Sequence, residues 1–411
     1  ITPRSSVWMD GYGARDRPSE GVYAPLWARA LALRQGAVTA VLVVADVLNF
    51  DPQQEARLKG AIADGVGVRP EAVILAATHT HCGPRVADIL MPGERDHAYL
   101  QWLEGEMLAA AREALAKAQP AHAAFSRARC SFGVNRRLPD GAGGVRFWYN
   151  PEGVVDRDLD TYWFSTEAGA PLASLTVYGC HPTSRSGYLL GPDYPGFVRQ
   201  GIERGWGGTA VWATGCAGNV RPGFLDEAGR FRAAEVAEVM EAGESIAAEA
   251  LAGRARQRSI HAPALSVACG TAYLPIETPP TRAELEAMAA NGNGVAAQWA
   301  RRLLVRMDAG GLEERVPFTI QTLRLDAAHA VVFLAGEVVA EIGLEIKQAY
   351  PYEAITTAAY ANGLVGYVPS RSIHPQGGYE VRGAYQFYLQ PAAFTAEAGD
   401  VILGEVRRQL G

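Results

Sequence analysis

Short apolar runs alternate with helical patterns along most of this 411-residue chain. The run at residues 40–45 has the composition of a buried strand, and residues 52–65 follow it with helical spacing. A second strand pattern at residues 174–178 begins the same alternation again. Strands that alternate with helices are typical of α/β domains. We therefore predict an α/β fold with mixed β-sheets flanked by helices, in a single large domain over residues 1–411.

Several local patterns sharpen this prediction. The segment at residues 134–160 is rich in Gly, Pro, Asp and Arg, so we expect a long loop there. An Asn-Gly-Asn-Gly break at residues 291–294 divides the helical pattern of residues 281–308. Further helices are expected to begin near Gly336-Glu337 and to cover residues 393–410.

Composition excludes some classes of protein. The net charge of −6 offers no basic face for a nucleic acid. No run of about 18 apolar residues predicts a transmembrane segment. The five cysteines form no Cys-x-x-Cys pair and are too scattered for a disulfide framework. Oligomeric state and compartment stay open, and the first residue, Ile1, is compatible with a removed leader.

Residues 76–84 read Ala-Ala-Thr-His-Thr-His-Cys-Gly-Pro and carry the clearest chemical signal. The apolar run at residues 72–75 predicts a strand, and alternate side chains of a strand point to the same face. We therefore expect His79 and His81 to face one point, as ligands of a zinc site do. The other interpretation is a pair of histidines held only by hydrogen bonds.

Four later segments also end an apolar run with polar residues at a turn. They are Cys180-His181-Pro182-Thr183 with Asp193 downstream, the glycine-rich residues 213–222, Leu334–Glu337, and Gly377–Glu380. Ligand pockets in α/β folds form where strand ends converge, so we expect these segments to share a pocket. Taken singly, each pattern also occurs at structural turns, and residues 213–222 lack the lysine of a phosphate-binding P-loop.

Together and in this order, these motifs resemble the neutral (alkaline, non-lysosomal) ceramidase family. The resemblance covers residues from about 11 to 390 and suits a short bacterial-type member, limited to the N-terminal catalytic domain. It rests on the Thr-His-Thr-His-x-Gly-Pro block, His181-Pro182-Thr183, Gly336-Glu337, the Asn-Arg loop at Gly133–Arg137, and Tyr367-Val368-Pro369 followed by Tyr379-Glu380. Members of that family carry a further C-terminal β-domain, and we expect none within this chain.

The resemblance implies a zinc ion held by four residues, namely His79, His181, Glu337 and Tyr379. Two imidazoles, a carboxylate and a further oxygen suit Zn²⁺ and leave room for a water molecule. Bound zinc lowers the pKa of that water from 15.7 to about 7. Glu341 lies one helical turn after Glu337 and is the alternative carboxylate ligand.

Other residues of the same motifs receive roles around the metal. We assign His81 to proton transfer or oxyanion binding and Arg136 to polarising the scissile carbonyl. Asp193 is assigned to orienting a ligand histidine by a hydrogen bond. The simpler interpretations are a surface charge for Arg136 and a turn-forming residue for Asp193. Substrate binding is assigned to Asn219, Tyr367 and Tyr385.

One loop departs from the family pattern. The family carries Gly-Asp-Val-Ser-Pro where this chain has Gly218-Asn219-Val220-Arg221-Pro222, and Cys82 replaces a serine of the histidine block. Because an arginine can bind a carboxylate or phosphate through two N–H groups, Arg221 is counted among the catalytic residues and puts ceramide itself in doubt.

The resemblance thus implies a zinc-dependent hydrolase that cleaves an amide bond of a small-molecule or lipid-like, ceramide-related substrate, as in sphingolipid metabolism. An esterase or lactonase would use the same site with another leaving group. Two other hypotheses are a TIM-barrel amidohydrolase, and a non-catalytic zinc-stabilised binding protein in which Arg221 blocks the pocket. The resemblance slightly favours a secreted or periplasmic location and leaves a cytoplasmic one open.

Overall fold

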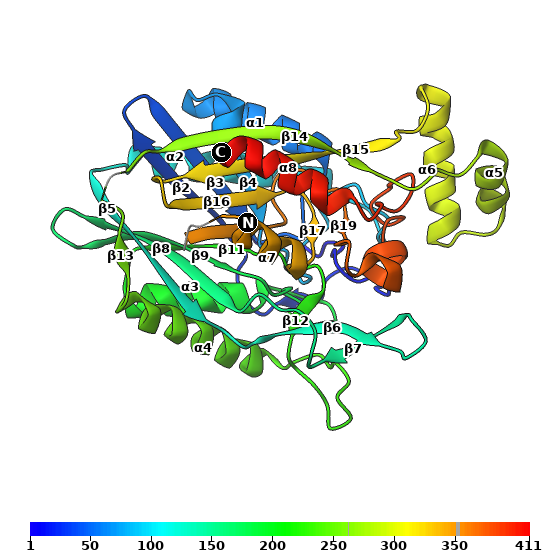
Figure 1. Ribbon diagram of the computed structural model, residues 1–411, viewed down its shortest axis with the longest axis horizontal. Coiled ribbons are helices and arrows are strands. Elements are labelled where there is room, and N and C mark those ends of the chain that lie inside the picture. Colours follow the sequence, from blue (N-terminus) through cyan, green and yellow to red (C-terminus); the bar gives the residue numbers. More distant parts are fainter. Residues whose placement is uncertain (262, 351–353) are drawn as a thin grey trace.

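Three β-sheets pack together at the centre of the molecule, and helices cover their outer faces (Figure 1). The computed structural model describes residues 1–261, 263–350 and 354–411. The central core contains apolar side chains from all three sheets, among them Leu42, Leu175 and Phe333. The predicted α/β class, with mixed sheets flanked by helices, is confirmed.

Each sheet has its own helical cover, which buries a separate apolar cluster on the outer face. The first sheet is β2 (Ala28–Gln35), β3 (Val38–Ala45) and β4 (Val73–Ala77), under α1 (Pro52–Val66) and α2 (His97–Ala116). The second sheet has the strand order β11-β9-β8-β5-β13 and lies under α3 (Asp193–Gly205) and α4 (Val236–Arg254). Its strands are β11 (Thr209–Thr214), β9 (Pro171–Tyr178), β8 (Asp158–Thr166), β5 (Ala121–Arg129) and β13 (Arg258–Ser259). The third is β14 (Ser266–Pro275), β15 (Arg315–Arg324), β16 (His329–Leu334) and β18 (Ala354–Ala358), under α7 (Ala340–Gln348) and α8 (Ala398–Leu410).

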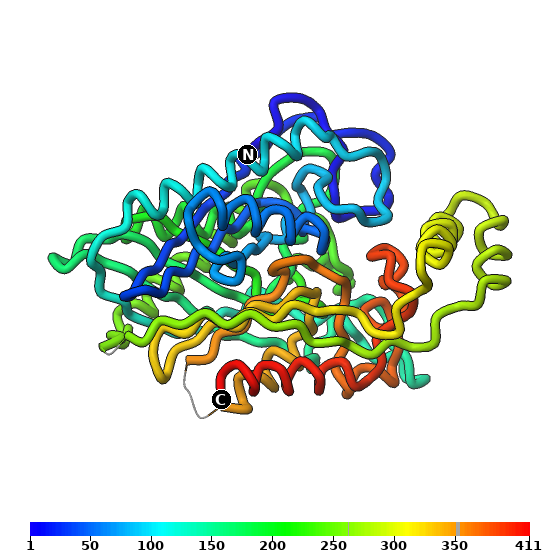
Figure 2. Tube along the Cα trace, turned by 90° about the horizontal axis from the view of Figure 1, so that it is seen from above, coloured from blue at the N-terminus to red at the C-terminus, as the bar shows by residue number. Residues whose placement is uncertain are grey.

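Smaller elements lie around these layers. Three short sheets pair β12 (Val220–Pro222) with β6 (Gly133–Pro139) and β7 (Val145–Asn150), β1 (Gly21–Val22) with β10 (Leu189–Leu190), and β17 (Glu337–Val338) with β19 (Tyr367–Val368). Helices α5 (Arg282–Ala290) and α6 (Val295–Ala309) form a hairpin that stands away from the sheets in both views (Figures 1 and 2). Within the described residues, no helix combines the length and apolar character needed to cross a membrane.

Two local predictions were wrong. Residues 134–160 were predicted to form a long loop, but they contain the β6–β7 hairpin and the start of β8. The loop-like composition of this segment includes the turn residues Asp140–Gly144, which connect the two short strands. Glu337 does not begin a helix: it lies in β17 beside Tyr367, and α7 starts only at Ala340. The predicted break at residues 291–294 and a helix in the range 393–410 are confirmed.

Candidate metal centre

The loops that follow β4, β9, β11, β16 and β18 meet at one edge of the sheets. The neighbours β3 and β4, β9 and β11, and β16 and β18 are parallel pairs, so their carboxyl ends lie at the same edge. Isolated bridges between Ala76 and Ala361 and between Gly215 and Ala358 join the ends of the three sheets. These loops therefore bring the predicted polar segments together.

The backbone at the histidine pair differs from the one that we predicted. Strand β4 ends at Ala77, and His79 has a left-handed φ of 65°. The prediction that strand alternation places His79 and His81 on one face was therefore wrong. Their rings still converge, because the chain turns sharply between them. Tyr360, at the end of β18, has a similar φ of 55°, and such backbone outliers cluster at functional sites.

Each of the three histidines is fixed from its Nδ1 atom. Since a carbonyl oxygen only accepts hydrogen bonds, each Nδ1 atom carries a proton, and in the neutral ring the Nε2 atom is the one that presents a lone pair. The three contacts are His79 with Leu48 O at 2.8 Å, His81 with Gly11 O at 2.9 Å, and His181 with Ala217 O at 2.6 Å. Outer partners of this kind orient the histidine ligands of metals.

Glycine is required where the chain supports His81. Gly11 has a φ of 102°, and a Cβ atom there would lie 2.7 Å from the Cβ atom of His81. A side chain at position 11 would thus displace the imidazole that the Gly11 carbonyl holds.

The three Nε2 atoms point toward one place. One ring nitrogen from each of His79, His81 and His181 lies within 4.8 Å of the other two. The Nε2 atoms of His79 and His81 are 3.3 Å apart. The Glu337 Oε2 atom lies 2.9 Å from His181 Nε2 and 3.3 Å from His79 Nε2. His79, His181 and Glu337 are each at most 1% exposed, whereas His81 is partly exposed.

The electrostatics of this cluster favour a bound cation. Burial lowers the pKa of His181 to about 4 and, with repulsion from the neighbouring imidazoles, the pKa of His81 well below its usual value. Burial raises the pKa of Glu337, but His79 and His181 outweigh it and hold that pKa well below the usual range. The lowered pKa values favour neutral rings for His181 and His81, whose nitrogen lone pairs then lie close to the Glu337 carboxylate. A metal ion relieves this repulsion, and nitrogen donors with one carboxylate suit Zn²⁺.

Three tyrosines enclose the cluster. The Tyr360 ring stacks on His79 with 4.0 Å between the ring centroids. The Tyr367 hydroxyl lies 3.3 Å from His181 Nε2, and the Tyr388 hydroxyl donates to Glu337 Oε1. Sequence reasoning missed Tyr360, although it follows a strand as the other site residues do. It also missed Tyr388, which no strand-end pattern marks.

Tyr379, the predicted fourth ligand, lies beside this group. Its ring centroid is 5.3 Å from that of Tyr367. Burial and the nearby Glu337 carboxylate raise the pKa of Tyr379 to about 12. Its side chain is 39% exposed, and its hydroxyl makes no hydrogen bond to the residues that the structure describes. Metal coordination by Tyr379 stays a prediction.

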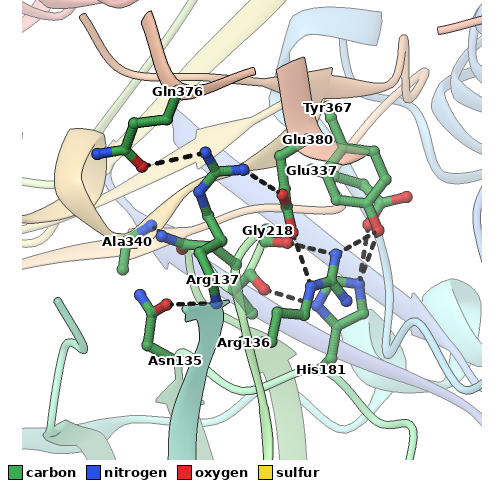
Figure 3. A network of polar contacts seen from close by, with 12 residues as sticks. Asn135, Arg136, Arg137, His181, Gly218, Glu337, Ala340, Tyr367, Gln376 and Glu380 are labelled. Carbon is green, nitrogen blue, oxygen red and sulfur yellow. Dashed lines mark hydrogen bonds and ion pairs between the residues drawn. The ribbon is translucent and has the colours of Figure 1, made fainter. Parts of the chain in front are cut away.

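Arg136 belongs to a buried ion-pair network next to the histidines (Figure 3). Its Nε atom lies 2.8 Å from Glu380 Oε1, and Arg137 Nη1 lies 2.5 Å from Glu380 Oε2. Arg136 Nη2 donates to the Gly218 carbonyl at 2.7 Å and to the Tyr367 hydroxyl at 3.1 Å. Burial lowers the pKa of Arg136, but Tyr367 and Glu380 outweigh it and hold that pKa well above the usual value. Because Arg136 is only 4% exposed, the interpretation as a surface charge is wrong.

Comparisons with known proteins agree with this architecture. No family model matches the chain. The neutral ceramidase of Pseudomonas aeruginosa is 24% identical over 240 residues, which cover 53% of this chain and 35% of that protein. The crystal structure of neutral ceramidase from Pseudomonas aeruginosa superposes with a TM-score of 0.74 and 19% identity over 97% of this chain and 70% of that one. A structure described as ceramidase complexed with C2 also gives 0.74, with 18% identity over 98% of this chain and 72% of that one.

The chain has the neutral ceramidase fold. The resemblance that the motifs indicated is thereby confirmed. The sequence match spans about a third of the length of that curated relative. The described strands form separate sheets of two to five strands instead of an eight-stranded barrel, so the TIM-barrel hypothesis was wrong. The absence of a C-terminal β-domain stays a prediction.

Within the neutral ceramidase fold, Glu337 is the carboxylate that contacts the histidines, and Glu341 is not. Glu341 accepts from the Asn219 side-chain amide at 2.8 and 3.1 Å, and burial raises its pKa. The Asn219 Oδ1 atom accepts from Ala340 N at the start of α7. Fully buried Asn219 therefore ties its loop to α7, which differs from the substrate-binding position that we predicted.

Two other predicted residues also lie outside the ring of histidines. The Asp193 carboxylate accepts from the backbone N–H groups of Ser184, Arg185 and Tyr194, while carbonyls orient all three histidines. Asp193 thus holds the loop after His181, which corrects the prediction that it orients an imidazole. Tyr385 packs on Trp299 of α6 with 5.6 Å between the ring centroids, against the helical hairpin, and its role in substrate binding stays a prediction.

Proposed function

We propose that this protein is a zinc-dependent hydrolase that cleaves the amide bond of an N-acyl, lipid-like substrate. One observation carries the proposal: three imidazoles, each fixed through Nδ1, direct their Nε2 atoms at one another and at the Glu337 carboxylate. The neutral ceramidases that share the fold and part of the sequence support the substrate class.

In this proposal, His79, His181 and Glu337 hold the ion, with Tyr379 as the further oxygen ligand. His79, His181 and Glu337 combine the donors that zinc prefers with the deepest burial in the site. When bound, Zn²⁺ polarises the amide carbonyl and lowers the pKa of water enough to supply hydroxide near neutrality.

His81 is the proton carrier in this proposal. It is the one imidazole of the three that is partly exposed, and its pKa well below the usual value keeps it neutral at pH 7. The Gly11 carbonyl holds its Nδ1 proton, so Nε2 is free to accept a proton and to donate it to the departing amine nitrogen. Its Nε2 atom is also close enough to the other two imidazoles to be a metal ligand itself. Metal analysis and kinetics of His81→Gln separate the two roles.

Arg136 stabilises the charge that develops on the substrate oxygen. Its bonds to Glu380, Gly218 and Tyr367 use Nε and Nη2, which leaves Nη1 for the substrate. Because Glu380 and Gly218 fix the guanidinium before substrate arrives, little reorganisation is needed during the reaction. Tyr367 connects Arg136 to His181 and so holds the two groups in register.

The test is hydrolysis of a panel of N-acyl amines by the purified protein, before and after treatment with a zinc chelator. We expect release of the free amine, its loss with the chelator and its return with added Zn²⁺. Aryl esters with the same acyl chains form a second panel that measures the preference for amide over ester. Bound zinc without turnover of any substrate would contradict the proposal and favour the binding protein.

A further inference from the structure

Arg221 presents a guanidinium that the protein leaves largely unbonded. It lies in β12 and is partly buried. Its one hydrogen bond to the described residues is a long contact of 3.4 Å from Nη2 to the Thr183 carbonyl. Its Nε atom is buried and has no partner among these residues, and none of their ion pairs includes Arg221. Most of the five N–H donors of this side chain therefore remain available.

Two phenyl rings hold this guanidinium in place. The Arg221 Cζ atom lies 4.4 Å from the centroid of Phe231 and 5.5 Å from that of Phe147. Contacts of this kind position an arginine through its flat faces and leave its N–H edges open. Phe147 is itself 51% exposed, so this edge of the site is accessible to a ligand.

A comparison with Arg136 shows what Arg221 lacks. The Arg136 Cζ atom lies 5.2 Å from the same Phe147 ring, so both guanidiniums flank one phenyl group. Glu380 neutralises Arg136, whereas no described carboxylate pairs with Arg221. Burial lowers the pKa of Arg221, with Tyr12 as the largest opposing influence. The rim of the site therefore carries an uncompensated positive charge.

Arg221 also lies close to the histidines in the folded structure. The neighbouring Val220 carbonyl accepts from His181 N at 3.0 Å, and Arg221 itself reaches the carbonyl of Thr183. Tyr12, which is near enough to Arg221 to influence its pKa, packs on the His81 ring with 5.1 Å between centroids. Arg221 thus lies beside the loop that carries His181 and, through Tyr12, near His81, to which the proposed function gives the departing amine.

We propose that Arg221 binds an oxyanion on the amine portion of the substrate, a carboxylate or a phosphate. This inference rests on the proposed function and narrows its substrate class to N-acyl amines with an anionic group, such as N-acyl amino acids. The planar guanidinium offers two parallel N–H donors that match a carboxylate or a phosphate. Such a charge-assisted pair is expected to change affinity by about 10- to 100-fold.

The kinetic test uses three substrates with one octanoyl chain, in which the amine is glycine, ethanolamine phosphate or neutral ethanolamine. We expect wild type to prefer at least one anionic substrate over the neutral one by about 10-fold or more in kcat/KM. In Arg221→Gln this ratio should fall toward one, chiefly through KM, and Arg221→Lys should restore part of it. Arg232→Gln is the matched control, because Arg232 also contacts a phenyl ring but pairs with Glu238 and is exposed.

A binding measurement keeps this inference separate from the proposed function. The three corresponding octanesulfonyl amides are not hydrolysed, so calorimetry with them reports affinity even if the protein has no amidase activity. Tighter binding of an anionic probe, abolished in Arg221→Gln, supports the anion site, and the better anion identifies carboxylate or phosphate. Equal binding of all three probes in wild type, or a preference that survives in Arg221→Gln, would overturn the inference.

Discussion

The floor and the rim of the candidate site are built in opposite ways. The floor consists of His79, His181 and Glu337, which are at most 1% exposed and have fixed partners. The rim contains Arg221 and the aromatic side chain of Phe147, which is 51% exposed. The floor is thus ordered before any substrate arrives, while the rim keeps unused donors and apolar surface. This difference indicates that the floor sets the reaction and the rim selects the substrate.

The physical cost of the floor explains its rigidity. Buried acceptors that face one another without a proton or a cation are unfavourable, so the surrounding carbonyls and tyrosines must hold them there. A partly exposed arginine such as Arg221 costs less, because the residue keeps part of its surface in contact with solvent. Changes in the floor should therefore have larger effects than changes in the rim.

The largest effect is expected for His181→Ala. Loss of this imidazole removes a metal donor and leaves the Glu337 carboxylate without its nearest imidazole. We expect kcat/KM to fall by about 1000-fold or more, which corresponds to about 4 kcal/mol of transition-state stabilisation. Steady-state kinetics on the best N-acyl amine checks this, and a fall of less than tenfold would remove His181 from the floor.

His81→Gln tests whether His81 belongs to the floor or to proton transfer. As a proton carrier, its loss should lower kcat by about 100-fold while the bound metal remains. As a metal ligand, its loss should lower both metal content and activity. Metal analysis and kinetics on the same preparation separate the two, and loss of the metal would return His81 to the ligand set that its Nε2 position permits.

Glu380→Gln tests the buried support beneath Arg136 and Arg137. Removing one partner of a buried ion pair leaves charge uncompensated, so we expect the free energy of unfolding at pH 7 to fall by about 3 kcal/mol. Burial raises the pKa of Glu380, but the two arginines outweigh it and lower that pKa below the usual 4.5. Its contribution is therefore present above about pH 4.5 and lost as the pH falls through the lowered value.

The difference between wild type and Glu380→Gln should thus shrink between pH 7 and about pH 3 in urea unfolding. Glu244→Gln is the matched control, because Glu244 pairs with Arg204 on the surface, where both side chains are more than half exposed. That control should change stability by less than about 1 kcal/mol at any pH. A constant difference between wild type and Glu380→Gln across this range would contradict the assignment.

The smallest effect is expected for Tyr385→Phe. Its ring packs on Trp299, and its hydroxyl has one long contact of 3.5 Å to Gln386. We expect kcat/KM within about twofold of wild type, since a contact of this length contributes little. A large rise in KM would restore Tyr385 to substrate binding and extend the rim toward α6.

The sequence predicted the fold class and the loops that form the site, because strand-end residues such as His181 and Glu337 follow readable apolar runs. It could not predict how these loops are braced. Arg136 and Glu380 are separated by 244 residues, and only the folded chain brings β6 beside the segment that begins at Tyr379. The motif likewise suggested that Asn219 binds substrate. In the folded chain its Oδ1 atom accepts a hydrogen bond from Ala340 N, the first residue of α7.

Backbone geometry was equally hidden from pattern analysis. Strand alternation predicted that His79 and His81 share a face, yet the left-handed φ of His79 is what directs the two rings together. Nothing local in the sequence distinguishes that turn from a continued strand. The Tyr388 contact with Glu337 depends in the same way on long-range packing.

Metal content per chain tests the central claim most directly. Protein purified without chelator and analysed by inductively coupled plasma mass spectrometry should contain about one zinc ion per chain. Glu337→Gln and His79→Ala should lose most of it, whereas Arg221→Gln should retain it, because the rim does not hold the ion. A wild-type protein without metal, or full zinc retention in His79→Ala and Glu337→Gln, would contradict the account.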